Sequence, residues 1–345
     1  MAVSTIANTT LVDMETGFQG YTSVAVVCMA SIVLIIGVPT NLGLLAAILF
    51  TPKLHNLNNF IIANITASGL FQLVAVIPWQ FSSIITGVWP FPLWFCHCTF
   101  LFALFTVDAL VNNMVVLAIY RYFVVVRRQN YFLKTKRVVV TMVVIAWSIS
   151  ILSSLILILG FSKTEFVPRY GRCIQQQTDV QTAKVYKLVT VGGISKGLIP
   201  IIFVYVRIFY EVRKKSLVTA HTTNDTRGGR EMAETAAQGG YKRPATAGSL
   251  RYRSLTQREV TITLVCVVNF LLFSCCYGPI VTVLALYDSK GMPVPGNLHK
   301  VCTLMYWIGN TLNPLAYAVL QKETRDVLLG YLRILCKGRN ACHQF

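Results

Sequence analysis

The chain has 345 residues, of which 54% are hydrophobic and only 13% charged, and its mean hydropathy is +0.59. A soluble domain of this length would struggle to bury so much apolar surface in one core. The net charge of +18 would indicate nucleic acid for a soluble protein, but here its distribution along the chain follows membrane topology. The composition therefore predicts a polytopic membrane protein and requires no nucleic-acid partner.

Seven apolar stretches are long enough to cross a bilayer, because about 20 helical residues span its ~30 Å hydrocarbon core. They lie at residues 22–50, 59–86, 92–126, 138–160, 185–210, 260–286 and 299–320. A count of six, with one re-entrant or buried stretch, is the alternative, but every stretch reaches spanning length. The predicted fold class is an all-α membrane protein, a seven-transmembrane helix bundle over residues 22–320.

Basic residues follow the odd-numbered spans, and the positive-inside rule makes those loops cytoplasmic. The first is Lys53, the second group runs from Arg121 to Arg137, and the third lies between Arg207 and Arg258. Residues 1–21 then form an extracellular tail without a cleavable signal peptide, so the first helix would act as the insertion signal. The sequon at Asn8 lies on that tail and is the predicted glycosylation site.

Two cytoplasmic segments have distinct compositions. Residues 216–255 are rich in Thr, Ala, Gly and charge, which predicts a flexible third cytoplasmic loop. Residues 321–345 are predicted to form a cytoplasmic amphipathic helix and tail on the inner leaflet, with Cys336 as a palmitoylation site. The helix is indicated by apolar residues at helical spacing, namely Val327, Leu328, Tyr331, Leu332 and Leu335, beside Lys322, Arg325 and Arg333.

The second span carries polar residues that should face the bundle rather than lipid. They are Asn64, Thr66, Ser68, Gly69 and Gln72. Pro78 follows them and should kink the helix.

Three of the ten cysteines lie at or beyond the extracellular rim, which is an oxidising compartment. One disulfide is therefore expected between the third helix and the loop before the fifth. Cys96 with Cys173 is the preferred pairing, and Cys98 with Cys173 is the alternative.

Two opposite charges lie at similar depth in the outer half of different spans, Asp108 in the third and Lys196 in the fifth. Neither should face lipid, where a charge costs ~2.5–3.5 kcal/mol on the insertion scale. We expect an Asp108–Lys196 ion pair that either ties the helices together or releases Lys196 to hold an acidic ligand.

The landmarks of the chain, in order, resemble those of the rhodopsin-like (class A) G-protein-coupled receptors over roughly residues 22–336. They are Asn41, Trp89, Cys96, Arg121, Trp147, Cys173, Pro200, Phe273 with Cys276-Tyr277-Gly278-Pro279, and Asn313-Pro314-Leu315-Ala316-Tyr317. Within this family, several segments look most like the melatonin receptors, the medium-chain fatty-acid receptor and the trapped-in-endoderm and moody receptors. The resemblance implies a plasma-membrane receptor with its N-terminus outside, a ligand in the outer half and a heterotrimeric G protein at the cytoplasmic face.

The chain departs from the family pattern at several switch positions. Tyr120 replaces the acidic residue that precedes the arginine in the family. Gly69 replaces the family's second-span Asp, and Tyr277 replaces its sixth-span Trp. In the family, a third-span Ser and a seventh-span Asn help that Asp to hold sodium. In this chain Leu110 and Gly309 occupy those two positions. Because a hard cation needs several oxygen ligands, we expect no metal and no other cofactor.

The resemblance assigns an activation switch whose inner hinge is Arg121, contacting Glu259 at the base of the sixth span in the resting receptor. The remaining switch residues are Tyr120, Tyr122, Phe273, Tyr277, Pro279, Asn313, Pro314 and Tyr317. The G protein would be received by Arg121, the loop from Val124 to Lys136, Arg213-Lys214-Lys215 and Arg258.

The predicted ligand site is mostly apolar and aromatic, which suits a small hydrophobic molecule or lipid. Its residues are Ala103, Leu104, Val107, Asp108, Lys196, Tyr277, Val281 and Tyr306. Amines usually need a carboxylate at the place of Ala103, so an aminergic ligand is not expected. A retinal-binding opsin would need a lysine where Trp307 lies.

Other function classes fit the sequence less well. An enzyme is not indicated, because Asp108 is the sole carboxylate within a predicted span. A secondary transporter would favour an internal repeat, and no period relates the two halves. A receptor-like protein that binds ligand without G-protein signalling is the stronger alternative, because Tyr120 and Tyr277 both alter switch positions.

Overall fold

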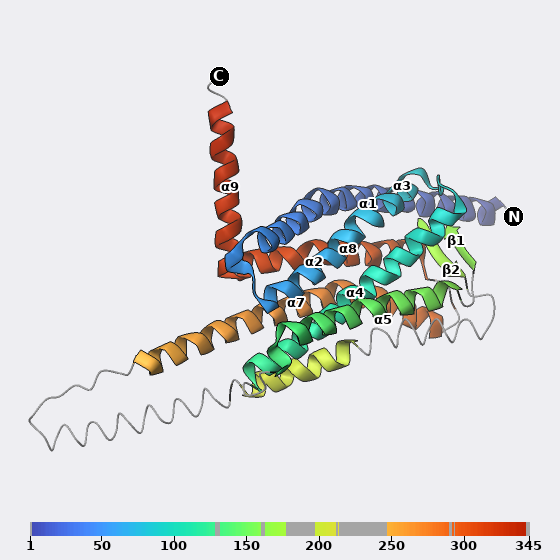
Figure 1. Cartoon of the computed structure of the whole chain (residues 1–345). Coiled ribbons are helices and arrows are strands. Elements are labelled where there is room, and N and C mark those ends of the chain that lie inside the picture. The colour runs from blue at the N-terminus through green and yellow to red at the C-terminus, as the bar shows by residue number, and fades with distance from the viewer. Residues whose placement is uncertain are drawn as a thin grey trace, which may run out of the picture.

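The computed structural model describes residues 2–127, 132–159, 163–176, 197–211, 213, 247–289, 292 and 294–342. Its helices lie side by side as an elongated bundle, and the last one turns away from the bundle (Figure 1). The labelled helices are α1 Ala2–Phe50, α2 Leu57–Ala75, α3 Ile77–Thr86, α4 Leu93–Val125, α5 Lys136–Leu159, α7 Ala247–Ser289, α8 Gly296–Leu320 and α9 Lys322–Cys342. Short 3₁₀ helices cover Pro52–Leu54 and Phe132–Lys134, and residues 197–211 are helical.

The described helices cover parts of all seven predicted spans, with α2 and α3 together forming the second. Among the described residues, five helices are long and apolar enough to cross a membrane by length and composition alone. The helix at 197–211 is a part of the predicted fifth span, and α8 is the seventh. Buried polar residues such as His299, Asn310 and Asn313 lower the hydropathy of α8 and explain why it is not among the five.

Two helices begin earlier than predicted. Helix α1 starts at Ala2, so the predicted extracellular tail continues the first span as helix. Helix α7 starts at Ala247, and the prediction of a flexible loop through residue 255 is therefore wrong for its last nine positions. Beyond Gly248 the sequence has no Gly or Pro before Gly278, and its Leu, Arg, Gln and Glu residues favour helix, so the sixth span extends into the cytoplasm.

The second span divides at Val76, whose backbone (φ −124°, ψ −55°) ends α2 and precedes α3. Pro78 lies in the first turn of α3, where its missing N–H is tolerated. The break lies next to Pro78, as the predicted kink required. The polar side chains before it are turned inward, since Thr66, Ser68 and Gln72 are all at most 2% exposed. Asn64 accepts a hydrogen bond from Trp147 Nε1 at 3.0 Å, which ties α2 to α5.

Helix α4 lies at the centre of the bundle and packs against α2, α5 and α7. The main hydrophobic core combines buried residues of α1, α2, α4, α5, α7 and α8 with residues of the 197–211 helix. Leu110, Leu117 and Ala118 of α4 are each at most 3% exposed within it. Arg121 lies one turn beyond Ala118 on the same helix, and this packing fixes its position.

Helix α9 has a polar and an apolar side, and its start contacts the ends of α1 and α8. Val327 and Leu328 pack against the main core, and Tyr331 OH lies 3.0 Å from Thr51 Oγ1. Lys322, Arg325 and Arg333 are exposed. This arrangement confirms the amphipathic helix, although the side chains of Leu332, Leu335 and Cys336 lie outside the described residues.

An antiparallel hairpin, which the sequence analysis did not anticipate, caps the outer end of the bundle. Strand β1 (Lys163–Val167) pairs with β2 (Arg172–Gln176), and Phe166 lies opposite Cys173. The segment is short and carries no alternating pattern long enough to separate it from an ordinary loop.

Candidate functional site

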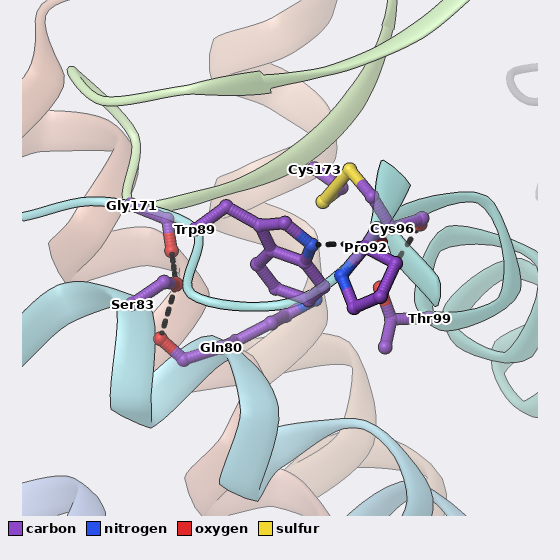
Figure 2. Close-up of a disulfide and its surroundings, with 8 residues drawn as sticks. All are labelled: Gln80, Ser83, Trp89, Pro92, Cys96, Thr99, Gly171 and Cys173. Atoms are coloured by element: carbon purple, nitrogen blue, oxygen red, sulfur yellow. Dashed lines mark hydrogen bonds between the residues drawn. A yellow bond between two sulfur atoms is a disulfide. The ribbon is translucent and has the colours of Figure 1, made fainter. Parts of the chain in front are cut away.

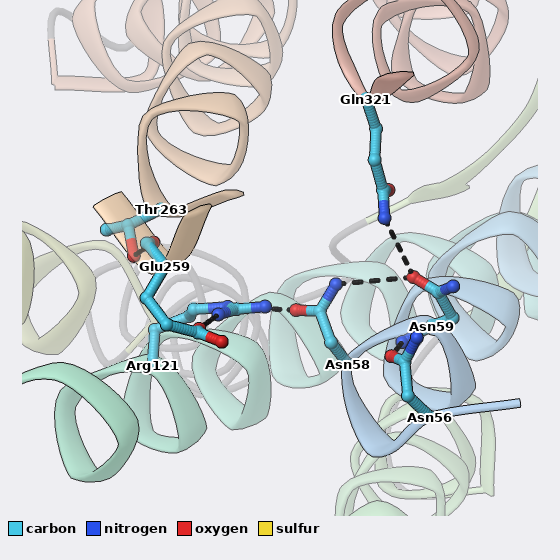
Figure 3. Close-up of polar contacts among 7 residues, drawn as sticks. All are labelled: Asn56, Asn58, Asn59, Arg121, Glu259, Thr263 and Gln321. Carbon is cyan, nitrogen blue, oxygen red and sulfur yellow. Dashed lines mark hydrogen bonds and ion pairs between the residues drawn. The ribbon is translucent and has the colours of Figure 1, made fainter. Parts of the chain in front are cut away.

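The cytoplasmic end of the bundle contains an ion pair between α4 and α7. Arg121 Nη1 lies 2.7 Å from Glu259 Oε2 (Figure 3). The side chain of Arg121 is 2% exposed and that of Glu259 is 31% exposed. The contact expected between these two residues is therefore present, and it joins the two helices at their inner ends.

Arg121 has a second acceptor that the sequence analysis missed. Its Nε donates to Asn58 Oδ1 at 2.9 Å, and Asn58 is buried at the start of α2. The neighbouring Tyr120 supplies no carboxylate, although its ring lies 5.7 Å from the Arg121 guanidinium carbon. Asn58 thus provides a neutral acceptor for the arginine. The only signal in the sequence was the run of asparagines, Asn56, Asn58 and Asn59, at the head of an apolar span.

The amide network continues from Asn58 toward the junction of α8 and α9. Asn58 Nδ2 lies 3.4 Å from Asn59 Oδ1, and Gln321 Nε2 donates to the same oxygen at 3.3 Å (Figure 3). Asn59 Nδ2 donates to the carbonyl of Leu54 at 3.0 Å, and the Asn56 side chain caps α2 by accepting from Asn59 N at 2.9 Å. Side-chain contacts therefore connect α7, α4, α2 and the end of α8 in one continuous series.

If the chain signals as the resemblance implies, replacing Asn58 with alanine should raise signalling in the absence of ligand, because the change leaves a buried guanidinium N–H without its acceptor. Leaving a buried donor unsatisfied costs about 1–3 kcal/mol, more for charged groups. The rate of guanine-nucleotide exchange on a G protein, measured in membranes without added ligand, would report the effect. Asn58→Asp, which offers Arg121 a charged acceptor, should lower the basal rate or leave it at the parental value. Equal basal exchange in the alanine variant and the parent would show that Asn58 does not restrain Arg121.

Aromatic rings connect the middle of α7 to α8. The rings of Phe273 and Tyr277 stack at 5.2 Å between centroids, and Tyr277 meets Tyr306 edge-on at 5.3 Å. Pro279 lies inside α7 two residues beyond Tyr277. Of the remaining predicted switch residues, Asn313, Pro314 and Tyr317 are buried in α8, and Tyr122 is half-buried on α4.

The predicted ligand residues fall into two neighbouring groups. Val107, Tyr277 and Val281 pack against a cluster that contains Tyr306 and Trp307. Leu104 instead packs against the cluster around Cys96 and Cys173. Ala103 and Asp108 are half-buried on α4.

The predicted partner of Asp108, Lys196, lies outside the described residues. Asp108 Oδ2 accepts hydrogen bonds from Ser153 Oγ at 2.7 Å and from Asn112 Nδ2 at 3.2 Å. Its carboxylate therefore contacts α5 as well as its own helix. The predicted glycosylation site Asn8 is in α1, and its side chain lies outside the described residues.

The disulfide Cys96–Cys173 is formed, with the two Cα atoms 5.6 Å apart (Figure 2). Both cysteines are buried, and Cys98 is free. The preferred pairing is therefore confirmed. The bond fixes strand β2 to the outer end of α4.

The turn of the hairpin contacts two helices at once. Ser83 Oγ of α3 donates to the carbonyl of Gly171 at 2.6 Å (Figure 2). Gly171 has a φ of +65°, and a Cβ there would lie 2.7 Å from Ile84 Cγ1, so both conformation and space require glycine. On the other side, the Tyr170 ring stacks on His299 of α8 at 4.2 Å. The hairpin thus closes over the outer ends of α3 and α8.

Comparisons with known proteins agree with this architecture. Residues 40–317 match the family model described as 7 transmembrane receptor (rhodopsin family). The solved structure of squid rhodopsin superposes with a TM-score of 0.73 and 19% identity, covering 92% of this chain and 87% of that one. The similarity to squid rhodopsin establishes the seven-helix fold.

Several receptors are similar in sequence over part or most of the chain. The human D(1B) dopamine receptor is 32% identical over 40% of this chain and 29% of that protein. The Xenopus laevis high-affinity lysophosphatidic acid receptor is 23% identical over 81% of this chain and 74% of that protein. The opossum (Didelphis virginiana) D(1A) dopamine receptor is 22% identical over 86% and 71%, respectively. None of these three is a member of the subgroup that the sequence analysis suggested.

Proposed function

Because the chain belongs to the rhodopsin family of seven-transmembrane receptors, we propose that it is a cell-surface receptor that activates a heterotrimeric G protein. Its ligand is a small hydrophobic or acidic molecule bound in the outer half of the bundle. The chain lies in the plasma membrane with its N-terminus outside, in keeping with the basic loops after the odd-numbered spans.

The observation that supports this proposal most is the closed contact at the inner ends of α4 and α7. Arg121 is buried between Glu259 and Asn58, so its charge is satisfied inside the bundle rather than offered to a partner. Opening α7 away from α4 would separate the ion pair and expose the arginine. A two-state element of this kind is what a ligand-controlled receptor requires, because a ligand can shift only an equilibrium between states that it binds differently.

The proposed G-protein surface surrounds this contact. It comprises Arg121, the loop from Val124 to Lys136, Arg213-Lys214-Lys215 and Arg258. Arg213 is exposed, and its guanidinium lies over the ring of Phe209 at 5.0 Å. Positive cytoplasmic loops also follow from topology alone, so family membership supports the partner more strongly than charge does.

The ligand class follows from the side chains of the outer half. Ala103 supplies no carboxylate for an ammonium group, which argues against amines even though dopamine receptors are among the relatives. A lysophosphatidic acid receptor is also among them, and the ligand in its name is an acidic lipid. The aromatic and aliphatic residues around Tyr277 and Tyr306 suit an apolar chain.

A second candidate function is a receptor that binds ligand without G-protein signalling. The altered switch positions Tyr120 and Tyr277 favour it over a transporter. Against it, the contact between Arg121 and Glu259 is intact although Tyr120 lacks a carboxylate.

Ligand class and signalling can be tested together in cells that express the receptor with each family of Gα subunits. We expect activation by members of a panel of acidic and neutral lipids and no response to a panel of biogenic amines. Robust activation by an amine would contradict the proposed ligand class. If a lipid measurably binds the receptor but activates no Gα subunit, the result would support the non-signalling alternative.

A further inference from the structure

A small cavity lies at the outer end of the bundle, between α1, α3, the hairpin and α8. None of the predicted ligand residues lines it; its polar walls are Gln80, Tyr170, Arg172, Lys300, Thr303 and Trp307. The cavity has room for about one water-sized group, so it can hold part of a ligand but not a whole one.

Two positive charges reach this cavity from different elements. Lys300 lies in the first turns of α8, where the helix N-terminus adds its own positive field. Arg172 is the first residue of β2, directly after the turn that Ser83 holds against α3. The disulfide at the next residue, Cys173, fixes the strand to α4. The position of Arg172 is therefore set by a rigid hairpin and does not depend on a mobile side chain alone.

Two deeply buried polar atoms in the cavity wall have no hydrogen-bond partner among the described residues. They are Nε1 of Trp307, whose side chain is 1% exposed, and Oε1 of Gln80, which is 4% exposed. Buried polar atoms in folded proteins are nearly always paired, and leaving one unpaired is costly. An indole N–H can only donate, so its natural partner is an oxygen acceptor.

We propose that this cavity is an anion subsite of the receptor that takes one oxygen of a carboxylate or phosphate head group. This inference rests on the proposed function, since it assumes a ligand in the outer half of the bundle. Trp307 Nε1 donates to the oxygen, and Arg172 and Lys300 neutralise its charge. Gln80 Oε1 accepts from a hydroxyl group that neighbours the anion.

The apolar part of such a ligand has a path from the same place. Val26 of α1 and Ile84 of α3 complete the wall of the cavity. Met29 and Ile32 follow Val26 at three-residue intervals along α1 and are 39% and 47% exposed, so apolar side chains continue from the cavity wall onto the outside of the bundle. A lipid with one acyl chain therefore fits better than a free inorganic anion, because its chain would stay in apolar surroundings while its head group meets the two cations.

Binding can be measured without a G protein, on the purified receptor in nanodiscs of phosphatidylcholine, by thermal stabilisation during titration. Three ligands distinguish the contribution of the head group to binding from that of the acyl chain. They are oleoyl lysophosphatidate, monoolein with the same chain but no charge, and glycerol 3-phosphate with the head group alone. We expect lysophosphatidate to raise the melting temperature more than monoolein does. If glycerol 3-phosphate binds as tightly as lysophosphatidate, the source of the anion is a soluble phosphate rather than a lipid.

Variants then locate the site. Lys300→Gln and Arg172→Gln should each weaken lysophosphatidate binding about tenfold, which corresponds to ~1.4 kcal/mol. Lys300→Arg keeps the charge and should bind like the parent. Arg169→Gln is the matched control, because Arg169 is exposed in the same hairpin and does not line the cavity. Trp307→Phe removes the donor but keeps an aromatic ring, and should also weaken binding.

Equal stabilisation by lysophosphatidate and monoolein, or unchanged binding in both glutamine variants, would overturn the subsite. Loss of binding in Arg169→Gln to the same extent would also do so, since charge at the mouth would then act without a site. Each of these results can occur with nucleotide exchange intact, and exchange can fail with binding intact. The subsite and the proposed signalling function are thus tested separately.

Discussion

Replacing Cys96 with alanine should remove most of the receptor from the cell surface. The disulfide closes a loop with a sequence separation of 77 residues, and the chain-entropy model assigns such a loop about 4.5 kcal/mol of stabilisation. The change also releases β2 from α4, so the hairpin would lose one of its anchors over the outer mouth. Surface labelling and the melting temperature of the purified variant would measure the loss.

Cys98→Ala is the control for this experiment, because Cys98 lies two residues away on the same helix and is free. It should reach the surface like the parent. Normal surface level and stability in Cys96→Ala, or a loss confined to Cys98→Ala, would contradict the pairing of Cys96 with Cys173.

Replacing Glu259 with alanine should raise ligand-independent signalling several-fold. The change leaves Arg121, which is 2% exposed, without its counter-ion. Removing one partner from a fully buried pair costs about 3–5 kcal/mol, and the effect should be smaller here because Glu259 is 31% exposed. The resting state carries this cost, whereas an open state in which Arg121 reaches water or a partner does not. The equilibrium therefore shifts toward the active state.

Glu259→Gln should give an intermediate increase, since it keeps an acceptor but removes the charge. Asp326→Ala provides a matched control, because Asp326 is an exposed acidic residue on the cytoplasmic helix α9. It should leave basal signalling unchanged. An unchanged basal level in Glu259→Ala, in cells where the parent responds to ligand, would show that the ion pair does not hold the receptor at rest.

The parts of the fold that the sequence predicted best depend on long, local patterns. A span needs only about 20 apolar residues, so composition alone located the helices. The boundaries were less accurate, because α7 continues past the change from apolar to polar residues at 259. Helix α7 begins at Ala247 because the residues before the apolar stretch favour helix, although a hydropathy pattern assigns them to a loop.

The candidate site was predictable where two residues belong to a recognisable pattern and not where contacts depend on three-dimensional packing. Arg121 and Glu259 were paired because the resemblance to the rhodopsin-like receptors places an acidic partner of the arginine at the base of the sixth span. Asn58 lies 63 positions from Arg121 in the chain, and the run of asparagines around it indicates a polar segment without indicating α4 as its partner. The docking of Gly171 on α3 was equally hidden, because a lone glycine in an outer loop has no distinctive pattern.

The outer cavity shows a further limit of sequence reasoning. Arg172 was not singled out from the sequence, since arginines are common beside membrane spans. Lys300 lies at the edge of a predicted span, where long basic side chains ordinarily extend to the membrane surface. Only the hairpin brings the two residues to one cavity.

We propose that the contact between Arg121 and Glu259 keeps a signalling-competent receptor at rest. The purified receptor can be reconstituted with purified G-protein heterotrimers, one Gα family at a time, and the rate of guanine-nucleotide exchange measured. We expect slow exchange with the parent, faster exchange with Glu259→Ala, and loss of that gain in Glu259→Ala combined with Arg121→Ala. Exchange that stays at the rate of the G protein alone for parent and variants, with every Gα family tried in turn, would contradict it.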